Sequence, residues 1–129
     1  MSTNIFLDNK AKELKIKNYV NCRCKDELIG IKCKEHECGI INTTNIDTND
    51  IHPHWTSFYV NGKEKYYFCS YGSPILPEVK DYLGKHILTS NFMIQSFNSQ
   101  ICGELSLIVI YLLDNCCKFE SIILELFKT

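Results

Sequence analysis

The sequence has no excess of charge of either sign. Its 14 basic and 15 acidic residues give a formal net charge of −1, so the overall charge does not attract the chain to nucleic acid or to an anionic membrane. Four lysines between positions 10 and 17 stand close to Asp8 and Glu13. This pattern is typical of a solvated helix face, and a contact with a polyanion is the alternative.

The sequence also lacks a membrane segment and a secretory leader. Its longest apolar run, Leu105 to Leu113, has roughly half the length that a membrane-spanning helix requires. The first eight residues have neither the basic start nor the apolar core of a signal peptide. We therefore expect residues 1–129 to form one soluble, intracellular domain without a membrane partner, in which thiols stay reduced.

Cysteine, by contrast, is abundant, with eight residues. Five possible zinc ligands gather in the N-terminal third: Cys22, Cys24, Cys33, His36 and Cys38. A Cys-x-Cys pair is tighter than the usual zinc spacer, however, and no second well-spaced pair closes a site, so we expect no metal. Cys116 and Cys117 follow an apolar segment, and we expect them to be packing residues.

A β-hairpin is the clearest local prediction. Two runs rich in β-formers, Trp55 to Val60 and Lys65 to Cys69, flank Asn61-Gly62, a pair that favours a tight hairpin turn. His54 then lies at the start of one strand and Cys69 at the end of its antiparallel neighbour. The hairpin is therefore expected to bring these two side chains together.

The remaining pattern predicts an α+β domain with a small antiparallel sheet against a buried central helix. Pro77 should open the short helix Glu78–Leu83, and Gly84 should stop it. The helices are expected at Asn9–Tyr19, Cys102–Leu113, Glu78–Leu83 and Phe119–Phe127, and further short strands at Ile40-Ile41 and Ile87-Leu88.

Cys102 is the first candidate for chemistry. It stands at the start of the central helix, where unpaired backbone N–H groups and the helix dipole favour a thiolate. We expect Asn98 or Ser99 to cap this helix. The side-chain amide of Gln95 could donate a hydrogen bond to an oxyanion formed beside Cys102. Cys102 is therefore the candidate nucleophile, and Gly103 lets a substrate come close.

A nucleophilic cysteine needs a base within hydrogen-bond distance. His36 and His86 lie in charged stretches, so we expect both at the surface. His52 and His54 lie on the loop that enters the hairpin, and His54 is the better candidate because the strand fixes it and Trp55 can shield it. The residues alone leave a second interpretation open: a buried structural cysteine and an ordinary surface histidine.

Three spaced motifs carry a resemblance to a known family. They are His54-Trp55, the aromatic-rich strand that ends Phe68-Cys69-Ser70-Tyr71-Gly72, and Gln95 followed after six residues by Cys102-Gly103. In this order they resemble the adenovirus-type cysteine proteases, and especially their relatives in Polinton/Maverick transposons and adintoviruses. His54, Gln95 and Cys102 match the family's catalytic histidine, glutamine and cysteine one by one.

The resemblance implies a papain-like cysteine protease fold of the adenain and SUMO-protease type. It implies a cysteine endopeptidase that cleaves viral or transposon structural precursor proteins during particle maturation, in the virion and in the host nucleus or cytoplasm. The substrate is then a polypeptide, and no cofactor is implied. An activating peptide or DNA is not evident, because no cysteine lies between Cys69 and Cys102, where adenoviral members bond such a peptide.

One position departs from the family pattern. Where the family has Asp or Glu to orient the histidine, this sequence has Cys69, and a thiol is a weak hydrogen-bond partner with little charge near neutral pH. We expect an active Cys102–His54 dyad with Cys69 in the orienting position. The alternatives are a catalytically impaired binding module and an isopeptidase acting on SUMO or ubiquitin-like modifiers.

Overall fold

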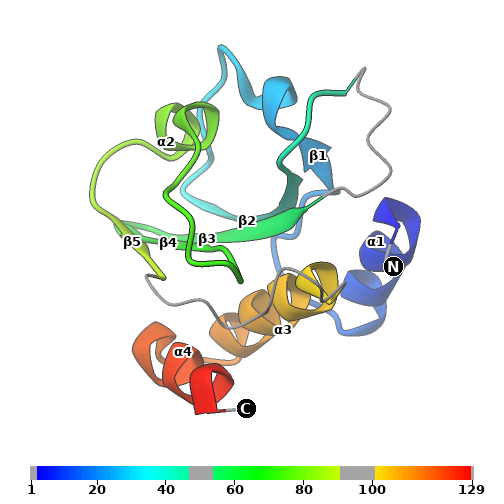
Figure 1. The fold of residues 1–129 in the computed structure, drawn as a ribbon, viewed down its shortest axis with the longest axis vertical. Coiled ribbons are helices and arrows are strands. Elements are labelled where there is room, and N and C mark those ends of the chain that lie inside the picture. Colours follow the sequence, from blue (N-terminus) through cyan, green and yellow to red (C-terminus); the bar gives the residue numbers. More distant parts are fainter. Residues whose placement is uncertain (1–2, 47–53, 91–100, 129) are drawn as a thin grey trace.

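A five-stranded sheet forms the centre of the computed structural model, which describes residues 3–46, 54–90 and 101–128. The strand order is β1-β2-β3-β4-β5, with an antiparallel centre and one parallel strand at each edge (Figure 1). The elements are α1 (Asn4–Glu13), β1 (Arg23–Cys24), the 3-10 helix η1 (Lys25–Leu28), β2 (His36–Asn42), β3 (Trp55–Asn61), β4 (Glu64–Phe68), α2 (Pro77–Leu83), β5 (Ile87–Thr89), α3 (Cys102–Asp114) and α4 (Phe119–Lys128). The predicted α+β class is confirmed.

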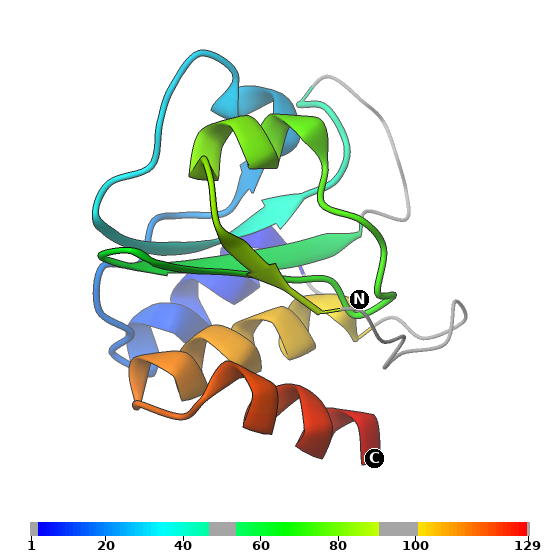
Figure 2. The ribbon, with the colours of Figure 1, turned by 90° about the vertical axis from the view of Figure 1, so that its left-hand side faces the viewer.

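The sheet lies between two helical layers (Figure 2), with α1, α3 and α4 on one face and α2 and η1 on the other. Alternation along β3 explains this arrangement, because successive side chains of a strand point to opposite faces. Trp55 packs in one core cluster with Cys102 of α3, whereas Phe58 and Val60 pack in another with Val79 of α2. A strand buried on both faces holds the two layers together.

The predicted hairpin is confirmed, with its turn one residue later than expected. Asn61 pairs with Glu64, so the loop consists of Gly62 and Lys63 alone. Gly62 has a φ of 64°, and Lys63 is not among the described residues with positive φ. A type II′ turn needs positive φ only at its first central residue. One glycine therefore suffices, and Asn61 joins the strand.

The first helix was predicted too far along the chain. The side chain of Thr3 accepts a hydrogen bond from the backbone N–H of Phe6 at 3.1 Å, which caps α1 at its start. Lys15, with a φ of 56°, follows the end of the helix. Val20 then lies beside β2, where its N–H donates to the carbonyl of Cys38 at 2.8 Å. The position of α1 is therefore set by its N-cap, Thr3, rather than by the apolar residues further along the chain.

The helix α3 begins at Cys102, as predicted, and ends one residue later than expected. Its N-cap residue is Ile101, which makes no side-chain capping bond. Asn98 and Ser99, which were expected to cap the helix, lie outside the described part. The helix is also not buried on every side, since Ile108 is 42% exposed. As part of an outer layer, α3 packs against the sheet on one side only.

The remaining predicted elements agree with the structure. Pro77 occupies the first turn of α2 and Gly84, with a φ of 88°, ends it. The strand β5 is one residue longer than predicted, and α4 buries Phe119 and Ile122 as expected. In the described ranges, no helix is both long enough and apolar enough to cross a bilayer.

Candidate active site

The hairpin brings His54 and Cys69 into contact. The pairing of Ser57 with Phe68 places the residue before β3 close to the residues that follow β4. The Nε2 atom of His54 lies 3.3 Å from the Sγ atom of Cys69, and Cys69 is only 2% exposed. The expectation that this cysteine would stand beside the histidine is therefore met by the geometry.

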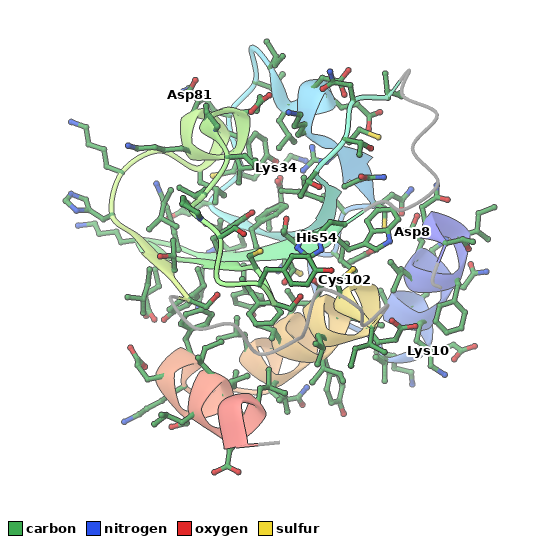
Figure 3. All side chains as sticks on the ribbon, in the orientation of Figure 1. Asp8, Lys10, Lys34, His54, Asp81 and Cys102 are labelled. Carbon is green, nitrogen blue, oxygen red and sulfur yellow. The ribbon has the colours of Figure 1, made fainter. Side chains whose placement is uncertain are left out.

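The helix α3 presents Cys102 to the same point. The backbone N–H of Trp55 donates to Cys102 Sγ at 3.4 Å, and the hydroxyl of Ser106 donates to the carbonyl of Trp55 at 3.2 Å. One turn of α3 thus holds the backbone of Trp55, next to His54, through both its N–H and its carbonyl. Figure 3 labels the His54 and Cys102 side chains, with Cys102 at the start of α3.

The second ring nitrogen of His54 is available to Cys102. Nδ1 is buried and has no hydrogen-bond partner among the described residues, whereas Nε2 is occupied by Cys69. The histidine therefore has one ring nitrogen against the Cys69 thiol and the other unpaired, and Cys102 Sγ lies against the backbone N–H of the next residue, Trp55. In a nucleophilic site this is the position of a base that has an orienting partner behind it.

The resting site is electrically neutral, contrary to the thiolate expected at a helix start. Burial raises the pKa of the Cys102 thiol, and this effect exceeds the lowering by backbone N–H groups, including those of Trp55 and Gly103. Burial also lowers the pKa of His54 to about 4. Near pH 7 the pair is therefore a thiol and an uncharged imidazole.

Sequence reasoning missed Tyr71. Its ring stacks on the His54 imidazole with a centroid distance of 4.1 Å and an interplanar angle of 6°. Burial raises the pKa of Tyr71, with further contributions from Cys102 and Cys69. Its position two residues after Cys69 in the aromatic motif was the available signal.

Ser90 is a second missed residue. Its hydroxyl accepts a hydrogen bond from the backbone N–H of Cys69 at 3.3 Å and lies 3.2 Å from the carbonyl of the same residue, to which it donates. This buried serine follows β5, so it fastens the edge of the sheet to the residue behind His54.

One predicted member of the site cannot be placed. Gln95 lies outside the described residues, so its oxyanion role stays a prediction, and His52, the histidine that was not chosen as the base, lies outside them too. The backbone N–H groups at the start of α3 have no partners within the helix and remain available as oxyanion donors. His36 and His86 are exposed, as expected for surface histidines.

The other cysteines occupy separate environments. Cys22 contacts the hydroxyl of Tyr19 at 3.6 Å, and Cys38 Sγ lies 3.4 Å from the carbonyl of Lys17. No three side chains that could ligate a metal lie together in the part of the chain that the structure describes. Cys116 and Cys117 are exposed, so the prediction that they pack inward is wrong. They lie in the turn after α3, beyond its buried face.

The fold is that of a papain-like viral cysteine protease. The chain superposes on the crystal structure of the ASFV pS273R protease with a TM-score of 0.69 and 16% sequence identity, covering 98% of this chain and 64% of that one. A second, selenomethionine structure of the same protease gives a TM-score of 0.55 at 18% identity, covering 73% and 42% of the two chains. The chain thus spans less than two thirds of the length of these proteases. No family model and no curated protein matches the sequence.

Proposed function

We propose that this chain is a cysteine endopeptidase that cleaves structural precursor polypeptides of a virus or transposon during particle maturation. The observation that carries the proposal is the position of His54, with Cys69 at one ring nitrogen, the other ring nitrogen unpaired, and Cys102 Sγ against the backbone N–H of the next residue. The fold supports it, because the chain shares this fold with the ASFV pS273R protease, and a protease acts on polypeptides. The site of action is the virion or the infected cell.

The proposed reaction is acyl transfer from a peptide bond to Cys102 and then to water. His54 Nδ1 takes the thiol proton as Cys102 Sγ bonds to the scissile carbonyl carbon, and the imidazolium then gives this proton to the leaving amine as the C–N bond breaks. Water attacks the thioester, His54 accepts a proton from it, and that proton returns to Cys102 Sγ as the carboxylic acid leaves. No cofactor takes part in these steps.

The developing oxyanion needs donors that are in place before the reaction. The backbone N–H of Cys102, at the start of α3, is one, and the side-chain amide of Gln95 is proposed as the other. Removal of one such donor costs on the order of 10²–10³ in turnover. Trp55, which is buried beside Cys102, excludes water from the pair.

The experiment is cleavage of a mixed peptide library, with products identified by mass spectrometry. We expect cleavage by the wild type, none by Cys102→Ala or His54→Ala, and normal cleavage by Cys117→Ser, an exposed cysteine at the far end of α3. Equal cleavage by wild type and Cys102→Ala would mean that a contaminant cuts the library. A folded wild type that cuts nothing rejects the proposal.

One observation favours a second function, that of a catalytically impaired peptide-binding module. The thiol of Cys69 stands where a carboxylate would stabilise an imidazolium, and His54 has a lowered pKa. In this case the library peptides bind without being cut. Enrichment of the same peptides by the wild type and by Cys102→Ala, with no new termini, is the result that distinguishes this function.

A further inference from the structure

The geometry points to Tyr71 as the positioning residue of the site, whose aromatic ring replaces the carboxylate that commonly orients a catalytic histidine. The inference rests on the proposed function, because it assigns a role within the same reaction. Its basis is the parallel stack of the Tyr71 and His54 rings, at 4.1 Å and 6°. Nothing in the chemistry of Cys69 alone explains how the imidazole is held.

An orienting group behind a catalytic histidine has two tasks: it fixes the ring, and it stabilises the imidazolium that forms during the reaction. Cys69 does both poorly. A thiol is a weak donor and a weak acceptor, and its contact with Nε2 is 3.3 Å long. An uncharged thiol also offers no counter-charge to the imidazolium. Both tasks therefore need another group.

Ring stacking performs the first task. The torsion about the Cβ–Cγ bond of histidine is broad, so the plane of the ring is not set by the side chain itself. A second ring, parallel to it and in contact, fixes that plane. The Cys69 contact then selects one of the two orientations that differ by half a turn, which leaves Nδ1 for Cys102.

The same ring performs the second task. The face of an aromatic ring carries negative charge density, and a cation within about 6 Å of its centroid is attracted to it. At 4.1 Å the His54 imidazolium lies well within this range. Burial makes the interaction stronger than it is in water. Among the described residues, Cys69 and Tyr71 contact the His54 ring, Cys102 lies against the backbone N–H of the next residue, and Glu104 acts on Cys102 from α3.

Tyr71 is itself held firmly enough to position another ring. Its neighbour Gly72, with a φ of 68°, donates its N–H to the carbonyl of Cys69 at 2.9 Å, which closes a tight turn around Tyr71. The Tyr71 side chain packs against the core cluster on the α2 face of the sheet. Ser90 fastens Cys69, where this turn begins.

The test compares Tyr71→Phe with Tyr71→Leu. Phenylalanine keeps the ring and leucine removes it, so we expect Tyr71→Phe to retain at least about half of kcat and Tyr71→Leu to lose about tenfold or more. KM should change by less than about twofold in both variants. The matched control is Tyr66→Leu, which removes a tyrosine that stacks on Phe119 instead. It should leave kcat unchanged.

A second pair of variants separates orientation from general damage. If Tyr71 stands in for a carboxylate, Cys69→Asp should restore much of the kcat lost in Tyr71→Leu, and its gain there should exceed its gain in the wild type. Equal losses in Tyr71→Phe and Tyr71→Leu, or no rescue by Cys69→Asp, would overturn the inference. Thermal unfolding of each variant shows whether the fold is intact.

A readout that needs no activity keeps the inference apart from the proposed function. The ¹⁵N resonances of the His54 ring should show one dominant tautomer in the wild type and in Tyr71→Phe, and averaged values in Tyr71→Leu. If the wild type cuts no peptide but shows this pattern, the proposed function fails while the role of Tyr71 stands. Unchanged ring resonances in Tyr71→Leu reject the inference even in an active enzyme.

Discussion

His54 and Cys102 are both uncharged at rest, since burial lowers the pKa of His54 and raises the pKa of Cys102. If the two residues formed an ion pair at rest, the loss of activity at low pH (the acid limb of the pH profile) would follow the protonation of the Cys102 thiolate. In a neutral pair, His54 must be unprotonated to accept the thiol proton. The acid limb therefore reports the pKa of His54 itself.

The first prediction concerns this acid limb. Because the pKa of His54 is lowered to about 4, kcat/KM should stay high as the pH falls below 6.5 and should decline only near pH 4. The measurement is the pH dependence of kcat/KM between pH 3.5 and 9 with a cleaved peptide. A decline centred near pH 6.5 contradicts a buried, neutral base.

The second prediction is the effect of Cys69→Asp. A carboxylate beside Nε2 orients the ring and favours the imidazolium, so kcat should rise and the acid limb should move to higher pH. Because Cys69 is 2% exposed, the introduced carboxylate is desolvated and should lower the free energy of unfolding. Cys69→Ser, which introduces no charge, is the control and should not raise kcat.

The third prediction is a pH dependence of stability. His54 has a pKa of about 4 when folded and an ordinary value of 6.5, so between these values the unfolded chain binds a proton that the folded chain does not. The contribution of His54 to the free energy of unfolding is therefore fully present above pH 6.5 and is lost as the pH falls toward 4. Urea unfolding of the wild type and of His54→Gln at several pH values isolates it. The two proteins should diverge only within that window.

At the scale of elements, the hairpin shows what a sequence can predict and α1 shows what it cannot. Two β-rich runs around a glycine were enough to bring His54 and Cys69 together, because pairing fixes which ends meet. The start of α1 depended on one cap, Thr3, that the apolar pattern did not reveal. The stack of Tyr71 on His54 depends on the tight turn at Gly72, whose shape no periodicity encodes.

The end of α3 gives the fourth prediction. Cys116 has a φ of 68°, and the bonds from Cys116 to Leu113 and from Cys117 to Leu112 form a Schellman motif. Glycine is the residue that adopts this conformation without strain. Cys116→Gly should therefore raise the free energy of unfolding by about 1 kcal/mol. Cys117→Gly, at a position without positive φ, is the control and should give no gain in the same denaturant titration.

The strand β2 gives the fifth prediction. A Cβ atom on Gly39 would lie 2.8 Å from Cγ2 of Val20 and 3.2 Å from Cε1 of Phe58. Valine is stiff about χ1 and cannot turn away easily. Gly39→Ala should cost about 1–3 kcal/mol, measured by thermal unfolding. The double variant Gly39→Ala with Val20→Ala should recover part of this loss. If the losses of the two single variants simply add in the double variant, the strain lies in the backbone rather than at Val20.

At the scale of the whole molecule, the candidate site lies between two layers. His54, Cys69 and Tyr71 come from the segments that flank the hairpin, while Cys102 comes from the helical layer beneath the sheet. Sequence patterns predicted most of the helices and strands but not the two helical layers, because amphipathic helices and alternating strands are local. The neutral state of the pair was not predictable in the same way, because it follows from how deeply the docked layers bury both residues.

The hydrogen bonds between α3 and the backbone of Trp55 have a consequence for when the proposed reaction becomes possible. The hairpin with its base is synthesised well before the cysteine, and the hydrogen bonds that place Cys102 span 47 and 51 positions of sequence. A nascent or partly folded chain therefore carries the base without a nucleophile in reach. The proposed reaction therefore has to wait until α3 has docked against the sheet.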